Sequence, residues 1–185
     1  MSYQATLNKY LQVIVGKKLE KLNLACEMMM FSFEDYAFHS LGLTRIIKDN
    51  DILVTTLDYQ NWDRKNDENN DESYFVKKYR DKIEGGVVIS VSVTPLYDVE
   101  IIMDNGIKIE LFVKNGYHHF DDENEQWVFF REDDHSHPFI SVWSKSVDIA
   151  TTWYAVHYNF IFFYRGQFHV RCSTLYFQMK VVCFA

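Results

Sequence analysis

Residues 87–113 carry the pattern that most constrains the fold of this chain. They read VVISVSVTP, VEIIM, DNG and IKIELFV in order, and apolar residues such as Ile107 and Ile109 alternate with charged ones. Asn105 and Gly106 suit a type I′ turn, whose two central residues both need positive φ. We therefore predict an antiparallel β-hairpin here.

Apolar spacing predicts two helices. In residues 2–15, apolar side chains recur three and four positions apart, and Gly16 suits the end of that helix. Residues 73–86 repeat an aromatic or aliphatic side chain every fourth position, with Lys and Arg between them. The pair Gly85-Gly86 follows, where a helix end favours a left-handed residue.

Four further segments read as strands. Residues 19–33 predict one long, bent strand, residues 51–62 a second, and residues 125–130 and 138–143 two short ones. The polar stretch 63–73 predicts a solvated loop. The expected class is α+β, mainly antiparallel β-sheet with one or two helices.

The chain changes composition near residue 149. Residues 150–185 contain eleven aromatic residues and no Asp or Glu, which divides the chain into an acidic α+β domain, 1–149, and an aromatic C-terminal extension, 150–185. Three readings stay open: further strands on the same sheet, a poorly ordered extension, or a segment that touches a membrane. Its longest charge-free stretch is shorter than the roughly 20 residues of a spanning helix.

Net charge restricts the class of partner. The whole chain carries −7, and residues 1–149 carry −10, because the extension holds three basic residues and no acid. An acidic body repels phosphate backbones and attracts basic proteins at long range. We therefore expect no nucleic-acid ligand.

Cysteine usage predicts a reducing compartment. Cys26, Cys172 and Cys183 are odd in number and lack metal-ligand spacing, so they read as free thiols. The N-terminal residues lack a basic segment followed by a long apolar one, so no secretory signal is expected. We expect a cytoplasmic protein.

Residues 118–137, HHFDDENEQWVFFREDDHSH, raise the possibility of a metal site. The candidate ligands are His118, Asp122, Asp133, His135 and His137. A six-residue strand between the two flanks would span about 20 Å and hold them apart. Exposed loop residues are therefore favoured, and a metal-assisted hydrolase using His118, His135 or His137 is the alternative.

Other catalytic patterns are weaker. A glycosidase-like pair needs one carboxyl with a raised pKa, whereas the acids here stand in runs that read as solvated. The sequence has no Gly-x-Ser-x-Gly elbow, and its only glycine pair follows a predicted helix, where a phosphate loop would precede one. We expect no cofactor and no enzyme activity.

A partner-binding surface is favoured over a metal or catalytic site, because it does not require particular side chains to converge on one point. The clustered acids, together with the acidic loop at 63–72, would attract a basic protein, and Trp127 or Trp143 would anchor it if its ring faces out. The alternative is that the acids only solubilise the domain and the tryptophans are core. The candidate acids are Asp121, Asp122, Glu123, Glu125, Glu132, Asp133 and Asp134.

Residues 14–144 resemble a known group of proteins. VGKKLEKLNLACEMMMFSF is similar to the opening segment of small bacterial immunity proteins encoded beside polymorphic or contact-dependent growth-inhibition toxins, and IELFVKNG and EQWVFF are similar to their later hairpin and Trp-containing strand. The matching residues are Gly16, Leu19, Ala25, Met28, Phe33, Gly106, Leu111, Phe112, Glu125, Gln126, Trp127 and Phe130.

The resemblance implies a cytosolic, non-enzymatic inhibitor that binds a cognate toxin domain, commonly a nuclease. An acidic inhibitor of a basic nuclease agrees with the separate argument from charge. The motifs are structural and none is catalytic, and the aromatic extension has no counterpart in that group.

Overall fold

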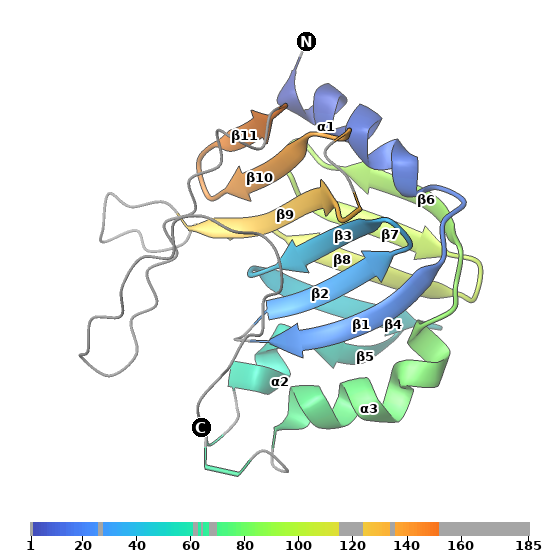
Figure 1. Ribbon diagram of the computed structural model, residues 1–185. Coiled ribbons are helices and arrows are strands. Elements are labelled where there is room, and N and C mark those ends of the chain that lie inside the picture. The colour runs from blue at the N-terminus through green and yellow to red at the C-terminus, as the bar shows by residue number, and fades with distance from the viewer. Residues whose placement is uncertain are drawn as a thin grey trace.

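Two antiparallel β-sheets pack face to face in the computed structural model, with helices at the margins (Figure 1). The structure describes residues 2–25, 28–60, 63, 65–66, 70–114, 124–133 and 136–151. Within these residues the α+β class, dominated by antiparallel sheet, is confirmed.

The six-stranded sheet has the order β1-β2-β3-β9-β10-β11. All its neighbouring strands pair antiparallel. Its strands are β1 Leu19–Ala25, β2 Met28–Phe33, β3 Tyr36–Ser40, β9 Glu125–Arg131, β10 Phe139–Trp143 and β11 Val147–Ala150.

The five-stranded sheet has the order β5-β4-β8-β7-β6 and is also antiparallel throughout. Its strands are β4 Leu43–Lys48, β5 Asp51–Thr55, β6 Val88–Val93, β7 Val99–Met103 and β8 Ile107–Phe112.

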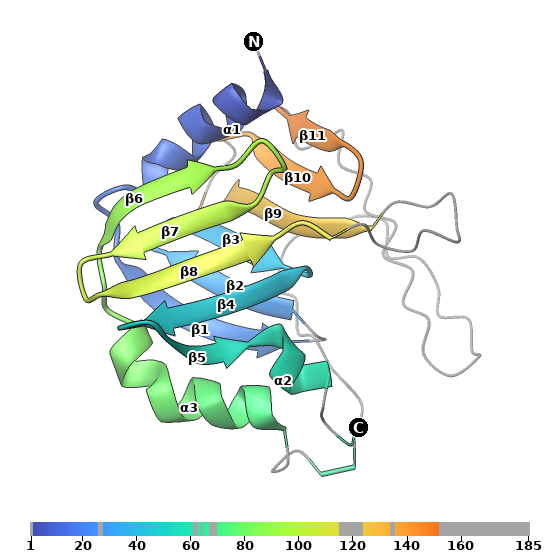
Figure 2. The same ribbon diagram turned by 180° about the vertical axis from the view of Figure 1, so that it is seen from behind.

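The helices lie along the margins of the two sheets (Figures 1 and 2). α1, Tyr3–Leu11, continues as the 3₁₀ helix Gln12–Ile14 and contacts β6; α3, Asp71–Ile83, contacts β1 and β5. α2, Thr56–Gln60, follows β5 directly. Ser2 and Asn70 cap α1 and α3, because each side-chain oxygen accepts a hydrogen bond from a first-turn N–H.

Both helices that the spacing predicts are present. α1 and its 3₁₀ continuation cover the first, and Gly16 beyond them has a φ of +84°. α3 covers the second, and Gly85 follows it with a φ of +88°. The two glycines adopt the left-handed conformation that the sequence indicates at both helix ends.

The β7–β8 hairpin is confirmed, but its turn is not type I′. Gly106 has a φ of +80° whereas Asn105 does not have positive φ, and the Gly106 N–H donates to the Met103 carbonyl at 3.2 Å. A type I turn followed by a left-handed glycine fits this three-residue loop. Positive φ at both central residues occurs instead at Asp49 and Asn50, between β4 and β5.

The single long strand predicted for residues 19–33 is wrong. This segment forms a hairpin in which β1 pairs with β2, so apolar residues of both strands face the same core. The strand predicted for 51–62 ends at Thr55, where α2 begins. β3, β4 and β11 are additional, and β11 spans the predicted domain boundary at residue 149.

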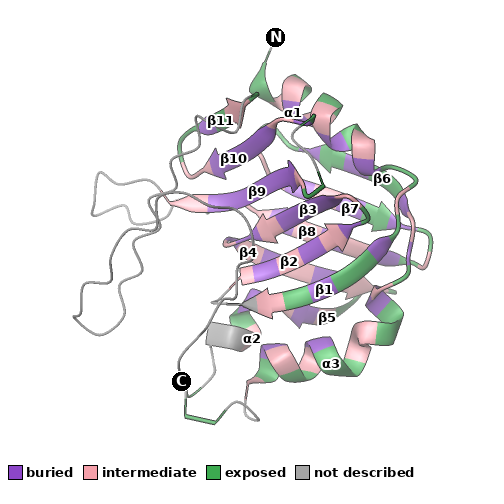
Figure 3. Ribbon diagram, viewed as in Figure 1, coloured by how far each residue is buried: buried purple, intermediate pink, exposed green. Residues whose placement is uncertain are grey.

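The main core lies between the sheets, as the alternating buried positions along the strands show (Figure 3). Phe31, Phe38 and Trp127 from the larger sheet meet Ile46 and Ile109 from the smaller one, and all five are 0% exposed. Removing a buried aromatic ring of this size costs about 3–5 kcal/mol. The packing of the two sheets against each other therefore contributes strongly to stability.

Candidate functional site

The described acids of the predicted binding surface lie at opposite ends of β9. Glu125 is the first residue of β9 and lies opposite Trp143 of the neighbouring strand β10. Glu132 and Asp133 come directly after the last residue of β9. Seven strand residues span about 20 Å, so these ends do not form one compact patch. The remaining candidates, Asp121, Asp122, Glu123 and Asp134, lie outside the described residues.

Glu125 is partly buried. Its carboxylate accepts a hydrogen bond from the Ser141 hydroxyl. Burial raises the pKa of Glu125, and the hydrogen bond from Ser141 opposes that rise. A carboxylate in this position loses solvation whenever it is charged, so Glu125 is a poor candidate for a long-range steering charge.

Asp133, at the other end of β9, is neutralised within the chain. Arg131 Nη2 lies 2.7 Å from Asp133 Oδ2 and 3.8 Å from Asp35 Oδ2. The next residue after Arg131 is Glu132, and burial raises the pKa of the Glu132 carboxyl group. The guanidinium therefore lowers the net negative charge at this end, where sequence reasoning expected solvated, unpaired acids.

Trp127 does not face out, so its prediction as an anchor is wrong. Its side chain is 0% exposed, and its Nε1 donates to the Tyr97 carbonyl at 2.9 Å. The ring packs against Phe38 with centroids 5.7 Å apart. Trp127 thus joins the six-stranded sheet to the β6–β7 turn, and the alternative reading as a core residue holds for it. Trp143 is partly exposed and stays a prediction.

His137 makes structural contacts through both ring nitrogens. Nδ1 lies 2.8 Å from the Pro138 carbonyl, and Nε2 lies 3.2 Å from the Tyr10 carbonyl of α1. The ring also packs edge-on against Tyr10, Tyr36 and Phe129. Burial lowers the pKa of His137 against the opposing effect of those carbonyls. These contacts favour a tie between α1 and β10 over a metal ligand. His118 and His135 lie outside the described residues.

The outer face of the five-stranded sheet is a surface that sequence reasoning missed. Figure 2 looks onto this face, and no described helix lies over it. Pairing brings Ile52, Ile47, Lys108 and Ile102 into one row across β5, β4, β8 and β7. Ile52 is 55% exposed and Ile102 37% exposed. These exposed aliphatic side chains on one sheet face make it a candidate interaction surface.

An ion-pair network that includes Lys108 of this row lies beside the isoleucines. Arg45 Nε donates to Glu110 at 2.9 Å, and Lys108 Nζ lies 2.6 Å from the same carboxylate and 3.7 Å from Glu100. The Arg45 guanidinium also lies over the Phe112 ring, 4.6 Å from its centroid. Apolar side chains beside fixed polar groups are the composition of a protein interface. The adjacent isoleucines at 101 and 102 could have indicated this surface from the sequence. Neighbouring residues of a strand face opposite sides of the sheet, so one of the two must lie on the outer face.

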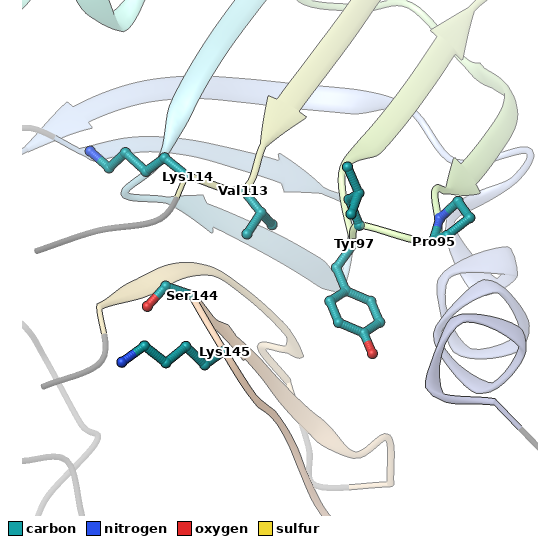
Figure 4. Close-up of a pocket in the computed structure, with 7 residues that line it drawn as sticks. Pro95, Tyr97, Val113, Lys114, Ser144 and Lys145 are labelled. Atoms are coloured by element: carbon teal, nitrogen blue, oxygen red, sulfur yellow. The ribbon is translucent and has the colours of Figure 1, made fainter. Parts of the chain in front are cut away.

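A surface cleft of about 240 Å³ opens between the turn after β6 and the turn after β10 (Figure 4). Tyr97, Val113 and Ser144 line it, and the Lys114 and Lys145 side chains extend toward the same side. The cleft is therefore cationic among its described residues, although the predicted surface around β9 is acidic. The backbone beneath it is fixed by the indole hydrogen bond to Tyr97.

The described residues contain no cluster of three His, Cys, Asp or Glu side chains placed to hold a metal ion. They also contain no helix whose length and apolar character would suit a membrane span. Comparison of the chain with protein-family models, with curated proteins and with solved structures gives no match.

Proposed function

We propose that this protein is a non-enzymatic, cytoplasmic binding protein that neutralises a cognate basic toxin domain, commonly a nuclease, as an immunity protein does. The observation that carries the proposal is the open outer face of the five-stranded sheet, with its exposed isoleucines and bordering ion pairs. The resemblance over residues 14–144 and the charge of −10 on residues 1–149 support the same class of partner.

The isoleucine row supplies the apolar centre of the proposed contact. Ile52 and Ile102 are each more than a third exposed, and covering one such side chain contributes up to about 1.5–3 kcal/mol. The Arg45–Glu110–Lys108 network is already paired, so a partner meets fixed charges and does not have to order them. Affinity then arises mainly on this face.

The excess acids act at longer range. A protein body with a charge of −10 accelerates encounter with a basic domain, and salt weakens that effect. This role does not need the acids to converge, which agrees with the separation of Glu125 from Glu132 along β9. The proposal therefore assigns speed of association to the acids and affinity to the sheet face.

The test first asks whether the reading frame beside this protein's gene encodes a basic toxin-like domain, and then measures binding of that purified domain by isothermal titration calorimetry. A neighbouring frame without such a domain would count against the proposal. Ile102→Glu places a charge in the isoleucine row and is expected to weaken binding at least about tenfold. Val15→Glu is the matched control, because Val15 is also an exposed apolar residue (40%) but lies in the turn after α1. Equal loss in both variants, or none in Ile102→Glu, would reject this face as the binding site.

Salt dependence tests the charge argument separately. Association of the wild-type protein is expected to slow sharply between about 50 mM and about 500 mM NaCl, because the Debye length shortens. Stopped-flow measurement of the association rate reads this directly. An association rate that does not change with salt would remove the steering role of the acids.

A further inference from the structure

The cleft between the turn after β6 and the turn after β10 has an apolar end and a cationic end. In Figure 4 the side chains of Tyr97 and Val113 lie toward one end, and the polar tips of Lys114, Ser144 and Lys145 all point toward the other. Pro95 and Leu96 extend the apolar end. A cleft with apolar surface at one end and a few polar groups at the other suits a small amphipathic ligand.

The positive charge at the cationic end is not neutralised by the described part of the chain. Lys114 and Lys145 are exposed, and neither ammonium group pairs with a carboxylate of the described residues. Lys17 and Lys108, by contrast, lie 2.8 Å and 2.6 Å from a carboxylate oxygen. Among the described residues that line the cleft, none is acidic. The two ammonium groups are therefore available to an external anion.

Hydrogen bonding leaves the polar end of the cleft with donors. The nearby carboxylate of Asp98 accepts from the Val113 N–H at 2.8 Å and from the Thr94 hydroxyl at 3.3 Å, so its oxygens are engaged within their own turn. Ser144 Oγ accepts from the Asn124 N–H at 3.2 Å, which leaves its hydroxyl hydrogen to donate. A hydroxyl donor beside two ammonium groups matches the oxygens of a carboxylate.

The backbone that carries these side chains is held in place. Tyr97 has a φ of +67°, a conformation uncommon for residues other than glycine. Its N–H donates to the Thr94 carbonyl at 3.0 Å, and its carbonyl accepts from the Trp127 indole at 2.9 Å. The Lys114 N–H donates to the buried Gln126 side chain at 3.0 Å. A ligand that enters the cleft therefore does not have to order its walls.

The volume of the cleft limits the size of the ligand. At about 240 Å³ it is smaller than the roughly 300–1,000 Å³ of pockets that hold drug-sized molecules. A group of about the size of one amino acid fits such a space. We propose that the cleft binds a small organic carboxylate, with Lys114, Ser144 and Lys145 contacting the carboxylate and Leu96, Tyr97 and Val113 covering an apolar group. This site is additional to the proposed toxin contact and does not depend on it.

NMR titration of the full-length, nitrogen-15-labelled protein with N-acetyl-leucine tests the proposal. Saturable chemical-shift changes are expected at the backbone amides of Leu96, Tyr97, Lys114 and Lys145. N-acetyl-leucine amide lacks the charge and acetate lacks the apolar group, so each is expected to bind at least about fivefold more weakly. Shift changes that do not saturate, or that lie elsewhere on the protein, would overturn the assignment. Equal binding of acetate and N-acetyl-leucine would also reject it, because it would show a general attraction of anions.

A charge-matched pair of variants tests the two lysines. The double variant Lys114→Gln/Lys145→Gln is expected to weaken binding of N-acetyl-leucine at least about tenfold. Lys9→Gln/Lys77→Gln is the control, because it removes the same charge from exposed positions on α1 and α3. Unchanged affinity in the first double variant, or an equal loss in both, would reject the site. The dispersion of each spectrum shows that the variant is folded, and the outcome is read without any toxin domain.

Discussion

The side-chain amide of Asn8 on α1 forms a two-way hydrogen bond with the backbone of Val93 on β6. Asn8 Oδ1 accepts from the Val93 N–H at 2.9 Å, and Nδ2 donates to the Val93 carbonyl at 3.2 Å. Gln4 and Gln12, one helical turn to either side, donate to the carbonyls of Val93 and Val91. The helix therefore satisfies the free edge of the five-stranded sheet and blocks pairing with another chain.

Asn8→Asp is expected to destabilise the protein by about 1–3 kcal/mol, because the carboxylate keeps the acceptor but loses the donor to the Val93 carbonyl. Lys9→Ala on the same helix is the control and is expected to change stability by less than about 0.5 kcal/mol. Urea denaturation followed by circular dichroism measures both. Equal stabilities would mean that the edge contact contributes nothing.

Gly42→Ala is expected to be more destabilising than Gly16→Ala, although only Gly16 has positive φ. A Cβ at Gly42 would lie 2.6 Å from the Phe112 carbonyl oxygen, where backbone must move, and overpacking of this kind costs about 1–3 kcal/mol. A Cβ at Gly16 meets open space, so only the backbone strain of about 1 kcal/mol remains. Thermal denaturation of the two variants gives the order, and the reverse order would contradict it.

The spacing of apolar residues in the sequence correctly predicted the helices and strands that bury only one side. α1, α3 and the β7–β8 hairpin each bury one stripe or face, so their apolar spacing is regular. The β1–β2 hairpin was read as one strand because no Gly or Pro separates its two apolar runs. The β2–β3 turn at Glu34 also lacks glycine, although Glu34 adopts a φ of +54°.

The candidate site was less predictable, because it depends on which side of a strand faces solvent. Trp127, Val128, Phe129 and Phe130 form a continuous apolar run, which is typical of a strand buried on both faces and argues against an exposed Trp127. The row formed by Ile52, Ile47 and Ile102 depends on strand order and register, which composition does not contain.

Trp127→Phe is expected to destabilise the protein by about 1–3 kcal/mol, because the Tyr97 carbonyl loses its donor and the smaller ring leaves a void. Trp143→Phe is the matched control and is expected to cost less, since Trp143 is partly exposed. Guanidinium denaturation measures both. Measuring toxin binding by the same two variants distinguishes a core role from a direct contact with the partner. A folded Trp127→Phe protein is expected to retain its affinity for the partner.

His39 is expected to make the protein acid-sensitive. The pKa of His39 in the folded protein is about 4, below the ordinary value of 6.5. Between these two pH values the unfolded chain binds a proton at His39 and the folded protein does not, so stability falls as the pH drops from about 6.5 to about 4. The full loss attributable to His39 is about 3 kcal/mol. His39→Gln removes this titration, and its free energy of unfolding should vary less than that of wild type between about pH 7 and about pH 4. Parallel pH profiles would contradict the assignment.

Glu125→Gln is expected to stabilise the protein at neutral pH. Burial raises the folded pKa of Glu125 above its ordinary value of 4.5, so its favourable contribution is complete below that value and is lost as the pH rises through the folded pKa. Glutamine keeps a hydrogen-bond partner for Ser141 without a charge. The gain in free energy of unfolding should therefore shrink as the pH falls toward 4.5. Glu20→Gln, at an exposed position on β1, is the control and should show no such trend. A Glu125→Gln protein that is less stable than wild type at neutral pH would mean that the charged carboxylate is favoured beside Ser141.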